Sequence, residues 1–171
     1  MKKVAILLEE QYEVLEAWYP YLRLVEAGFR PVFVGSGTVS VYKSKEGYPA
    51  KTETSINDIA PDEFNGVIVP GGFAPDKLRR YEKINLFVNR IFSQGKPTAA
   101  ICHGGSVLVS ARVLKGKKAT CSPAIKDDII NAGAFYTEAD VVVDGNLITS
   151  RKPDDLPAFC REFITFLNHN R

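Results

Sequence analysis

Short apolar runs alternate with amphipathic stretches along most of the chain. The first run, Lys3–Leu8, is followed by an acidic segment and by a helical pattern through Tyr19–Ala27 that ends at Gly28. Glycine is favoured just beyond the end of a helix. The next apolar run, Pro31–Gly35, predicts a second strand. Strands that alternate with helices in this way predict a mostly parallel sheet with helices on both faces.

The rest of the pattern completes a flavodoxin-like, doubly wound α/β fold. Val39–Thr54 predicts a hairpin around the turn Lys45-Glu46-Gly47, and two short runs near the C-terminus predict another. The chain has no linker or repeat, so we expect one domain over residues 1–171. The remaining expected elements are strands at Val67–Val69, Pro97–Ile101, Lys118–Cys121, Val141–Asp144 and Leu147–Ser150, and helices at Tyr81–Ser93, His103–Val113, Ile125–Ala132 and Asp155–Asn168.

Composition and charge narrow the possible partners. The net charge is +2, and the basic residues are dispersed, so we expect neither nucleic acid nor a membrane surface as a partner. No apolar run approaches the ~20 residues that span a bilayer. The apolar stretch after Met1-Lys2-Lys3 stops at Glu9 and lacks a cleavage site, which predicts a strand and not a signal peptide. We therefore expect a cytoplasmic protein.

Few residues can carry metal or imidazole chemistry. The three cysteines are an odd number without a Cys-x-x-Cys pair, which argues against a disulfide framework or a zinc site. Of the two histidines, His169 lies in the last three residues, so His103 is nearly the only candidate for imidazole chemistry. We expect no metal and no cofactor.

The strongest chemical signal is Cys102 at the end of a predicted strand. Small residues stand two before it, at Ala100, and two after it, at Gly104. This spacing is typical of a nucleophile elbow, where a strand and a helix approach closely and the backbone is strained. A helix N-terminus there favours the thiolate, which predicts a depressed pKa for Cys102 alone among the cysteines. The alternative is an ordinary buried cysteine.

Two other segments end next to this elbow in a doubly wound sheet. Gly71-Gly72 follows the preceding strand, and glycines there let backbone N–H groups point into the cleft as an oxyanion hole. The acidic loop Glu9–Glu16 follows the first strand, and a carboxyl pressed against the thiol would stay protonated. A simple turn and a solvated helix start are the alternative interpretations of these two segments.

With these motifs the chain resembles the PfpI superfamily, which includes the intracellular PfpI-type peptidases and the Parkinson-disease protein. The resemblance covers almost the whole chain. Because His103 directly follows the cysteine, the chain resembles the PfpI-like subgroup in particular. The matching motifs are Glu13-x-x-Glu16-x-x-Tyr19-Pro20, Val69-Pro70-Gly71-Gly72, Ala74-Pro75-Asp76, Ala100-Ile101-Cys102-His103-Gly104, Ile125-Lys126-Asp127-Asp128, Asn131-Ala132-Gly133, Val141-Val142-Val143-Asp144 and Thr149-Ser150-Arg151.

The resemblance implies a role for each site residue. Cys102 is the expected nucleophile, Glu16 the carboxyl that contacts it, and Glu13 a neighbour of Glu16 in the pocket. The backbone amides of Gly72 and His103 form the expected oxyanion hole. An acid from a neighbouring subunit orients the imidazole of His103 in PfpI-like members, and the matching position here is Asp76. The resemblance thus implies a homo-oligomer, a dimer or a hexamer.

This chain also departs from the family pattern. Relatives commonly have Gly-Pro-Gln where this chain has Gly104-Gly105-Ser106, and a tyrosine where it has Ser122. Both differences predict a roomier site. At the position of Asp76 relatives can also have glutamate, so the side chain here is one methylene shorter. Substrate preference therefore does not follow from the resemblance.

Three functions remain open. The first is a stress-related cysteine hydrolase of the intracellular peptidase type, which attacks a peptide or small carbonyl substrate. The second is a cofactor-free glyoxalase III or deglycase that acts on methylglyoxal or glyoxal, for which Glu16 would move a proton at the adjacent carbon. The third is a redox-sensing or chaperone-like protein in which Cys102 is oxidised. A glutamine amidotransferase is disfavoured because only His169 lies well downstream of the cysteine.

Overall fold

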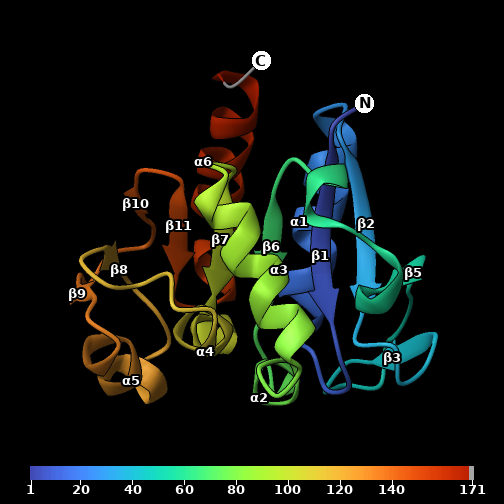
Figure 1. Cartoon of the computed structure of the whole chain (residues 1–171), viewed down its shortest axis with the longest axis horizontal. Coiled ribbons are helices and arrows are strands. Elements are labelled where there is room, and N and C mark those ends of the chain that lie inside the picture. The colour runs from blue at the N-terminus through green and yellow to red at the C-terminus, as the bar shows by residue number, and fades with distance from the viewer. Residues whose placement is uncertain (170–171) are drawn as a thin grey trace.

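A computed structural model describes residues 1–169, and within them a seven-stranded sheet forms the centre of the molecule (Figure 1). The strand order is β10-β11-β7-β6-β1-β2-β5, and only β10 runs antiparallel to its neighbour. The five main parallel strands therefore follow the order 2-1-3-4-5, which is the flavodoxin-like order. The predicted fold class is confirmed. The strands are β1 (Lys3–Leu8), β2 (Arg30–Gly35), β5 (Thr54–Ser55), β6 (Val67–Val69), β7 (Thr98–Ile101), β10 (Val142–Asp144) and β11 (Leu147–Ser150).

Helices cover both faces of this sheet. Helices α1 and α6 pack against each other on one face, while α3 crosses the other face beside α2 and α4 (Figure 1). β1 is the centre of the core, and Val4–Leu8 are all fully buried, as expected for a parallel strand covered on both sides. The helices are α1 (Val14–Glu26), α2 (Ala74–Leu78), α3 (Glu82–Ser93), α4 (Gly105–Ser110), α5 (Lys126–Asn131) and α6 (Leu156–His169), and the 3-10 turns are η1 (Ile56–Asp58), η2 (Pro61–Glu63), η3 (Cys102–Gly104), η4 (Pro123–Ile125) and η5 (Pro153–Asp155).

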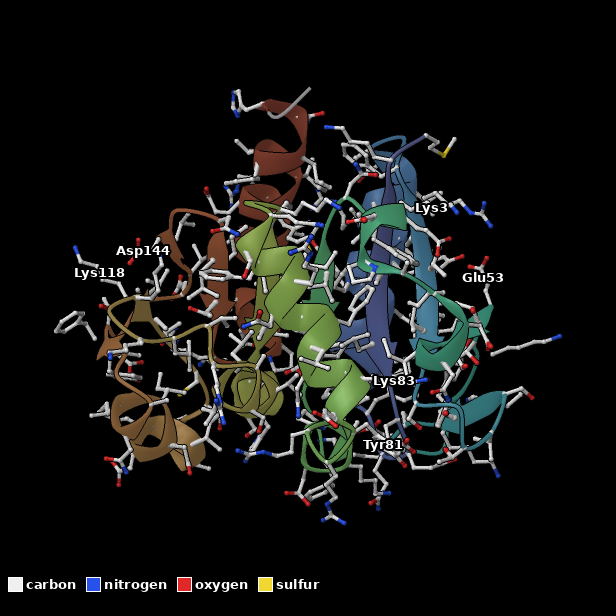
Figure 2. The ribbon with its side chains drawn as sticks, viewed as in Figure 1. Lys3, Glu53, Tyr81, Lys83, Lys118 and Asp144 are labelled. Carbon is white, nitrogen blue, oxygen red and sulfur yellow. The ribbon has the colours of Figure 1, made fainter. Side chains whose placement is uncertain are left out.

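Two small ribbons flank the sheet. The predicted hairpin at residues 39–54 is present as β3 (Val41–Lys43) paired with β4 (Pro49–Lys51). On the opposite flank, β8 (Lys118–Ala119) pairs with β9 (Phe135–Tyr136) outside the main sheet. The backbone N–H of Lys118 donates to the Asp144 carboxyl over 2.8 Å, and Figure 2 shows this pair on the flank opposite Glu53.

Several predicted boundaries are wrong, and each has a local cause. Helix α1 begins at Val14 and not near Tyr19, because the Glu13 side chain accepts the N–H of Glu16 and caps the helix inside the acidic segment. The strand predicted at Lys118–Cys121 has two residues and lies outside the main sheet. The helix predicted at His103–Val113 is shorter, because a 3-10 turn replaces its start and Arg112 has a φ of 58°.

All main parallel strands end at the same edge, which is the lower edge in Figure 1. The loops that follow β1, β6 and β7 meet there, on either side of the point where the strand order reverses. Ligands bind at this position in open α/β sheets. Within residues 1–169, none of the helices combines the length and the apolar character needed to cross a bilayer.

Candidate active site

Cys102 stands at the turn where β7 ends. Its φ of 59° lies in the left-handed region, which L-residues other than glycine rarely adopt. The turn is tight, since a Cβ on Gly104 would collide with the carbonyl oxygen of Val69 in the neighbouring strand. The strained geometry and the small residue expected of a nucleophile elbow are therefore both present.

The thiol of Cys102 faces the imidazole of the next residue. The Sγ atom lies 3.3 Å from Nδ1 of His103. Burial lowers the pKa of His103, and the positive charge of Lys45 lowers it further. A neutral imidazole with its proton on Nε2 can accept the thiol proton at Nδ1. The two residues can thus act as a nucleophile and its base.

Glu16 is a fully buried carboxyl beside this pair. Its Oε2 accepts the backbone N–H of Gly71 over 2.7 Å, and its Oε1 is buried without a hydrogen-bond partner among the residues that the structure describes. Burial and the negative charge of Glu13 raise the pKa of Glu16 to about 8. The carboxyl is therefore largely protonated at neutral pH and can donate or take a proton near the sulfur.

The Gly71-Gly72 loop runs between the glutamate and the cysteine. A Cβ on Gly71 would collide with Oε2 of Glu16 and would lie 2.8 Å from the Cβ of Cys102. The backbone N–H groups of Gly72 and His103 face the sulfur, and both oppose the rise in its pKa. These are the two amides that the resemblance implies for an oxyanion hole.

The predicted acidity of Cys102 is wrong in direction. Burial raises the pKa of its thiol to about 11, and ionised Glu16 raises it further. The helix dipole is weak here, because a 3-10 turn precedes α4 and α4 has only six residues. Burial raises the pKa of Cys121 and of Cys160 as well, to about 12.

Asp76 does not join these residues within one chain. It lies on α2, its side chain is 69% exposed, and it pairs with Arg80 over 2.6 Å. It is not among the residues that line the pocket at Cys102. Among residues 1–169, the His103 imidazole makes no hydrogen bond besides the contact of its Nδ1 with Cys102, so its Nε2 has no orienting acid in the described part of this chain.

The site also contains residues that the sequence did not suggest. A cavity of about 190 Å³ opens above the thiol, and Lys45, Phe73 and Pro153 line it together with the predicted residues Glu13, Glu16, Gly72, Cys102 and His103. Lys45, Phe73 and Pro153 come from a turn, a loop and a 3-10 segment that have no motif of their own, so only the fold brings them to the site. Ser122, which the resemblance implied for the pocket, directs its hydroxyl to the sulfur and opposes the rise in its pKa.

The fold and the site together define a class of protein: flavodoxin-like α/β domains with a cysteine at a nucleophile elbow beside a buried glutamate. Residues 2–166 match the DJ-1/PfpI family. The chain belongs to this family, and the predicted membership in the PfpI superfamily is confirmed.

Known relatives cover the chain almost completely. A deglycase of Pyrococcus abyssi is 46% identical over 165 residues, which are 96% of this chain and 99% of the relative. YraA of Bacillus subtilis, whose name assigns it provisionally to the cysteine proteases, is 40% identical over 97% of this chain and 98% of its own length. A crystal structure from Anabaena variabilis, of a two-domain protein with DJ-1/ThiJ/PfpI-like and ferritin-like domains, matches with a TM-score of 0.95 and 43% identity; the match covers 98% of this chain and 48% of that one.

Proposed function

We propose that this protein is a cysteine-dependent deglycase that converts 2-oxoaldehydes, and their early adducts with amines, to 2-hydroxy acids. The observation that carries the proposal is the buried carboxyl of Glu16, largely protonated at neutral pH beside the Cys102 thiol. Conversion of a 2-oxoaldehyde moves a hydrogen between adjacent carbons, which needs a group that both donates and takes protons. The deglycase name of the Pyrococcus abyssi relative supports the same chemistry.

The reaction begins with attack by sulfur. With methylglyoxal, Sγ of Cys102 bonds to the aldehyde carbon, and the thiol proton passes to Nδ1 of His103. The negative charge on the carbonyl oxygen faces the N–H groups of Gly72 and His103. Protonated Glu16 then gives its proton to this oxygen, which leaves a hemithioacetal. With an amine adduct, sulfur replaces nitrogen at the same carbon: the thiol proton passes to His103, and the leaving amine takes its proton from Glu16.

Glu16 then transfers the hydrogen between the two carbons. Its carboxylate takes the proton from the former aldehyde carbon while the imidazolium of His103 protonates the ketone oxygen, giving an enediol. Glu16 returns the proton to the second carbon, and the first hydroxyl loses its proton to His103, giving a thioester of lactate on Cys102. Water attacks the thioester carbon and gives one proton to Glu16. Sulfur leaves and regains its proton from His103.

Peptide hydrolysis is the second candidate. The Cys102–His103 pair, at 3.3 Å, has the arrangement that a thiol peptidase uses to attack a carbonyl and protonate a leaving amine. The provisional protease name of the Bacillus subtilis relative favours it as well. The small cavity of about 190 Å³ suits a small carbonyl better than a chain of residues on either side of a scissile bond. The raised pKa of the Cys102 thiol disfavours its oxidation and its nucleophilic attack alike, so this pKa does not separate the redox-sensor hypothesis from the two enzymes.

One assay separates these candidates. Wild-type protein is incubated with methylglyoxal, with a methylglyoxal adduct of N-acetyl-lysine, and with a fluorogenic peptide library. We expect lactate and free amine from the first two, no lactate or amine with Cys102→Ala, and full activity with the matched variant Cys121→Ser. Peptide cleavage without lactate formation would replace the deglycase by the peptidase.

We also propose that a homo-oligomer completes the site, with Asp76 of one subunit orienting His103 of another. Two observations support this: Nε2 of His103 lacks a partner in its own described chain, and the Asp76 side chain is exposed. Helix α1 supplies a candidate contact surface. Its exposed apolar side chains are Leu15, Leu22 and Val25, whereas its aromatic side chains Trp18, Tyr19 and Tyr21 pack against the core.

The state of the cysteines supports a cytoplasmic location. All three are free, and Cys121 and Cys160 are buried. Free buried thiols are typical of proteins from reducing compartments. We therefore propose that the protein acts in the cytoplasm.

A further inference from the structure

Lys45 brings a positive charge to the pocket from outside the family motifs quoted above. It lies in the turn between β3 and β4 and lines the same cavity as Glu16, Cys102 and His103. No step of the proposed reaction uses it. Lysine side chains usually direct their charged end into water. Lys45 instead lies along the wall of the cavity that contains the nucleophile, which suggests that its charge has a function there.

The turn that carries Lys45 is fixed to the site by Tyr12. The backbone N–H of Lys45 donates to the Tyr12 carbonyl over 3.0 Å, and the Tyr12 hydroxyl donates to the Tyr48 carbonyl over 2.8 Å. Tyr12 is fully buried and also bridges to Gly72, whose backbone N–H faces the sulfur. The backbone of Lys45 is therefore held in a constant position relative to the reacting centre.

The ammonium of Lys45 has no carboxylate partner within the described part of the chain. It forms none of the ion pairs found there, although Glu13 and Glu16 line the same cavity. Glu13 uses Oε2 to cap α1, and Glu16 is largely protonated. The positive charge of Lys45 nevertheless acts on the site: burial lowers the pKa of His103, and Lys45 lowers it further.

We propose that Lys45 is a specificity-determining residue that binds a carboxylate on the substrate. The preferred substrates are then 2-oxoaldehydes, and their adducts, that carry a carboxylate a few bonds from the attacked carbon. An exposed lysine binds such a group by charge attraction, which screening by salt weakens. The prediction that the substrate is a 2-oxoaldehyde rests on the proposed function. The prediction that Cys102 reacts faster with anionic than with neutral reagents does not.

Alkylation of Cys102 measures this preference without any turnover. Iodoacetate and iodoacetamide both need the thiolate, so the ratio of their rates cancels the thiolate fraction and reports the attraction of the carboxylate. We expect Lys45→Gln to lower this ratio roughly tenfold at low salt, as for loss of one charge contact near a protein surface. Lys45→Arg should preserve the ratio, and the difference between Lys45→Gln and wild type should shrink in 1 M salt. Peptide mass spectrometry assigns the rates to Cys102.

Lys43→Gln is the matched control. Lys43 lies on the same hairpin and is exposed, but it does not line the cavity, so its loss changes the net charge equally. We expect its rate ratio to equal that of the wild type. Equal ratios in Lys45→Gln and wild type, or an equal fall in both variants, would overturn the proposal.

A substrate pair tests the same residue during turnover. Methylglyoxal is neutral, whereas 4,5-dioxopentanoate is a 2-oxoaldehyde with a carboxylate and gives 2-hydroxypentanedioate in the same reaction. We expect Lys45→Gln to raise KM for the dioxopentanoate by a larger factor than KM for methylglyoxal; an equal effect on both would contradict the inference. If the wild type converts neither compound, the proposed function fails, and the alkylation ratio alone decides the role of Lys45.

Discussion

Gly71 donates its backbone N–H to Oε2 of Glu16 over 2.7 Å, and this bond joins the loop after β6 to the first turn of α1. The loop thereby holds the carboxyl beside the elbow, and its next residue, Gly72, directs an N–H group toward the sulfur. A single backbone segment thus positions the Glu16 carboxyl and one of the two amides proposed for the oxyanion hole. Neither part can move without disturbing the other.

Gly71→Ala should therefore disrupt the site more than the fold. The added Cβ would collide with Glu16 Oε2 and approach the Cβ of Cys102 to 2.8 Å. We expect a loss of at least tenfold in kcat/KM for methylglyoxal and a destabilisation of roughly 1–3 kcal/mol in urea unfolding. Gly95→Ala is the control. An alanine at the φ of Gly95, 72°, strains the backbone, but nothing lies within 4 Å of the new Cβ. Unchanged kcat/KM in Gly71→Ala would show that this loop does not position the acid.

Glu16→Gln should make Cys102 more acidic. Ionised Glu16 contributes to the raised pKa of the thiol, about 11, and the neutral amide removes that repulsion. The rate of iodoacetamide alkylation, followed from neutral to alkaline pH, should therefore rise at lower pH in the variant. Glu26→Gln removes a charge from the exposed end of the same helix and should leave the profile unchanged. An identical profile for Glu16→Gln and wild type would contradict the coupling of the two groups.

Glu16 should also make the stability of the fold depend on pH. Its pKa is about 8 in the folded state and near 4.5 when exposed, so the folded protein binds more protons between these values. Proton release on unfolding means that the free energy of unfolding falls as pH rises through this window. We expect a fall of a few kcal/mol in the wild type, measured by urea unfolding at several pH values, and a smaller fall in Glu16→Gln. Parallel curves for the two proteins would show that Glu16 is ionised in the folded state.

The sequence predicts the strands, the strand order and the elbow better than the surroundings of the thiol. Continuous apolar runs such as Lys3–Leu8 identify buried parallel strands directly, and the small residue at Gly104 identifies the turn. Burial of individual groups is not visible in a local pattern. The pattern of the acidic segment therefore does not show that Glu13 caps a helix or that α1 begins at Val14. For the same reason the direction of the pKa shift of the thiol is predicted wrongly. Lys45 reaches the site only through the tertiary contact of its turn with Tyr12.

Asp76→Ala should lower activity through a neighbouring subunit. The exposed carboxyl can orient His103 only from another chain, since it does not line the pocket of its own. We expect the variant to lose most of its lactate formation while Cys102 alkylation by iodoacetamide changes little. Mixtures of Asp76→Ala with Cys102→Ala should recover part of the activity when subunits exchange. A monomer in sedimentation velocity with full activity at the same concentration would exclude a shared site.

The most direct test of the account is to trap the lactate thioester on Cys102. Wild-type protein is mixed with methylglyoxal, quenched in acid and treated with hydroxylamine, which cleaves a thioester but not a hemithioacetal. We predict that peptide mass spectrometry finds Cys102 modified by one methylglyoxal unit, that hydroxylamine releases it as lactohydroxamate, and that Glu16→Gln forms no such adduct. Lactate production with no thioester at Cys102, or a thioester formed at the wild-type rate in Glu16→Gln, would contradict the central claim.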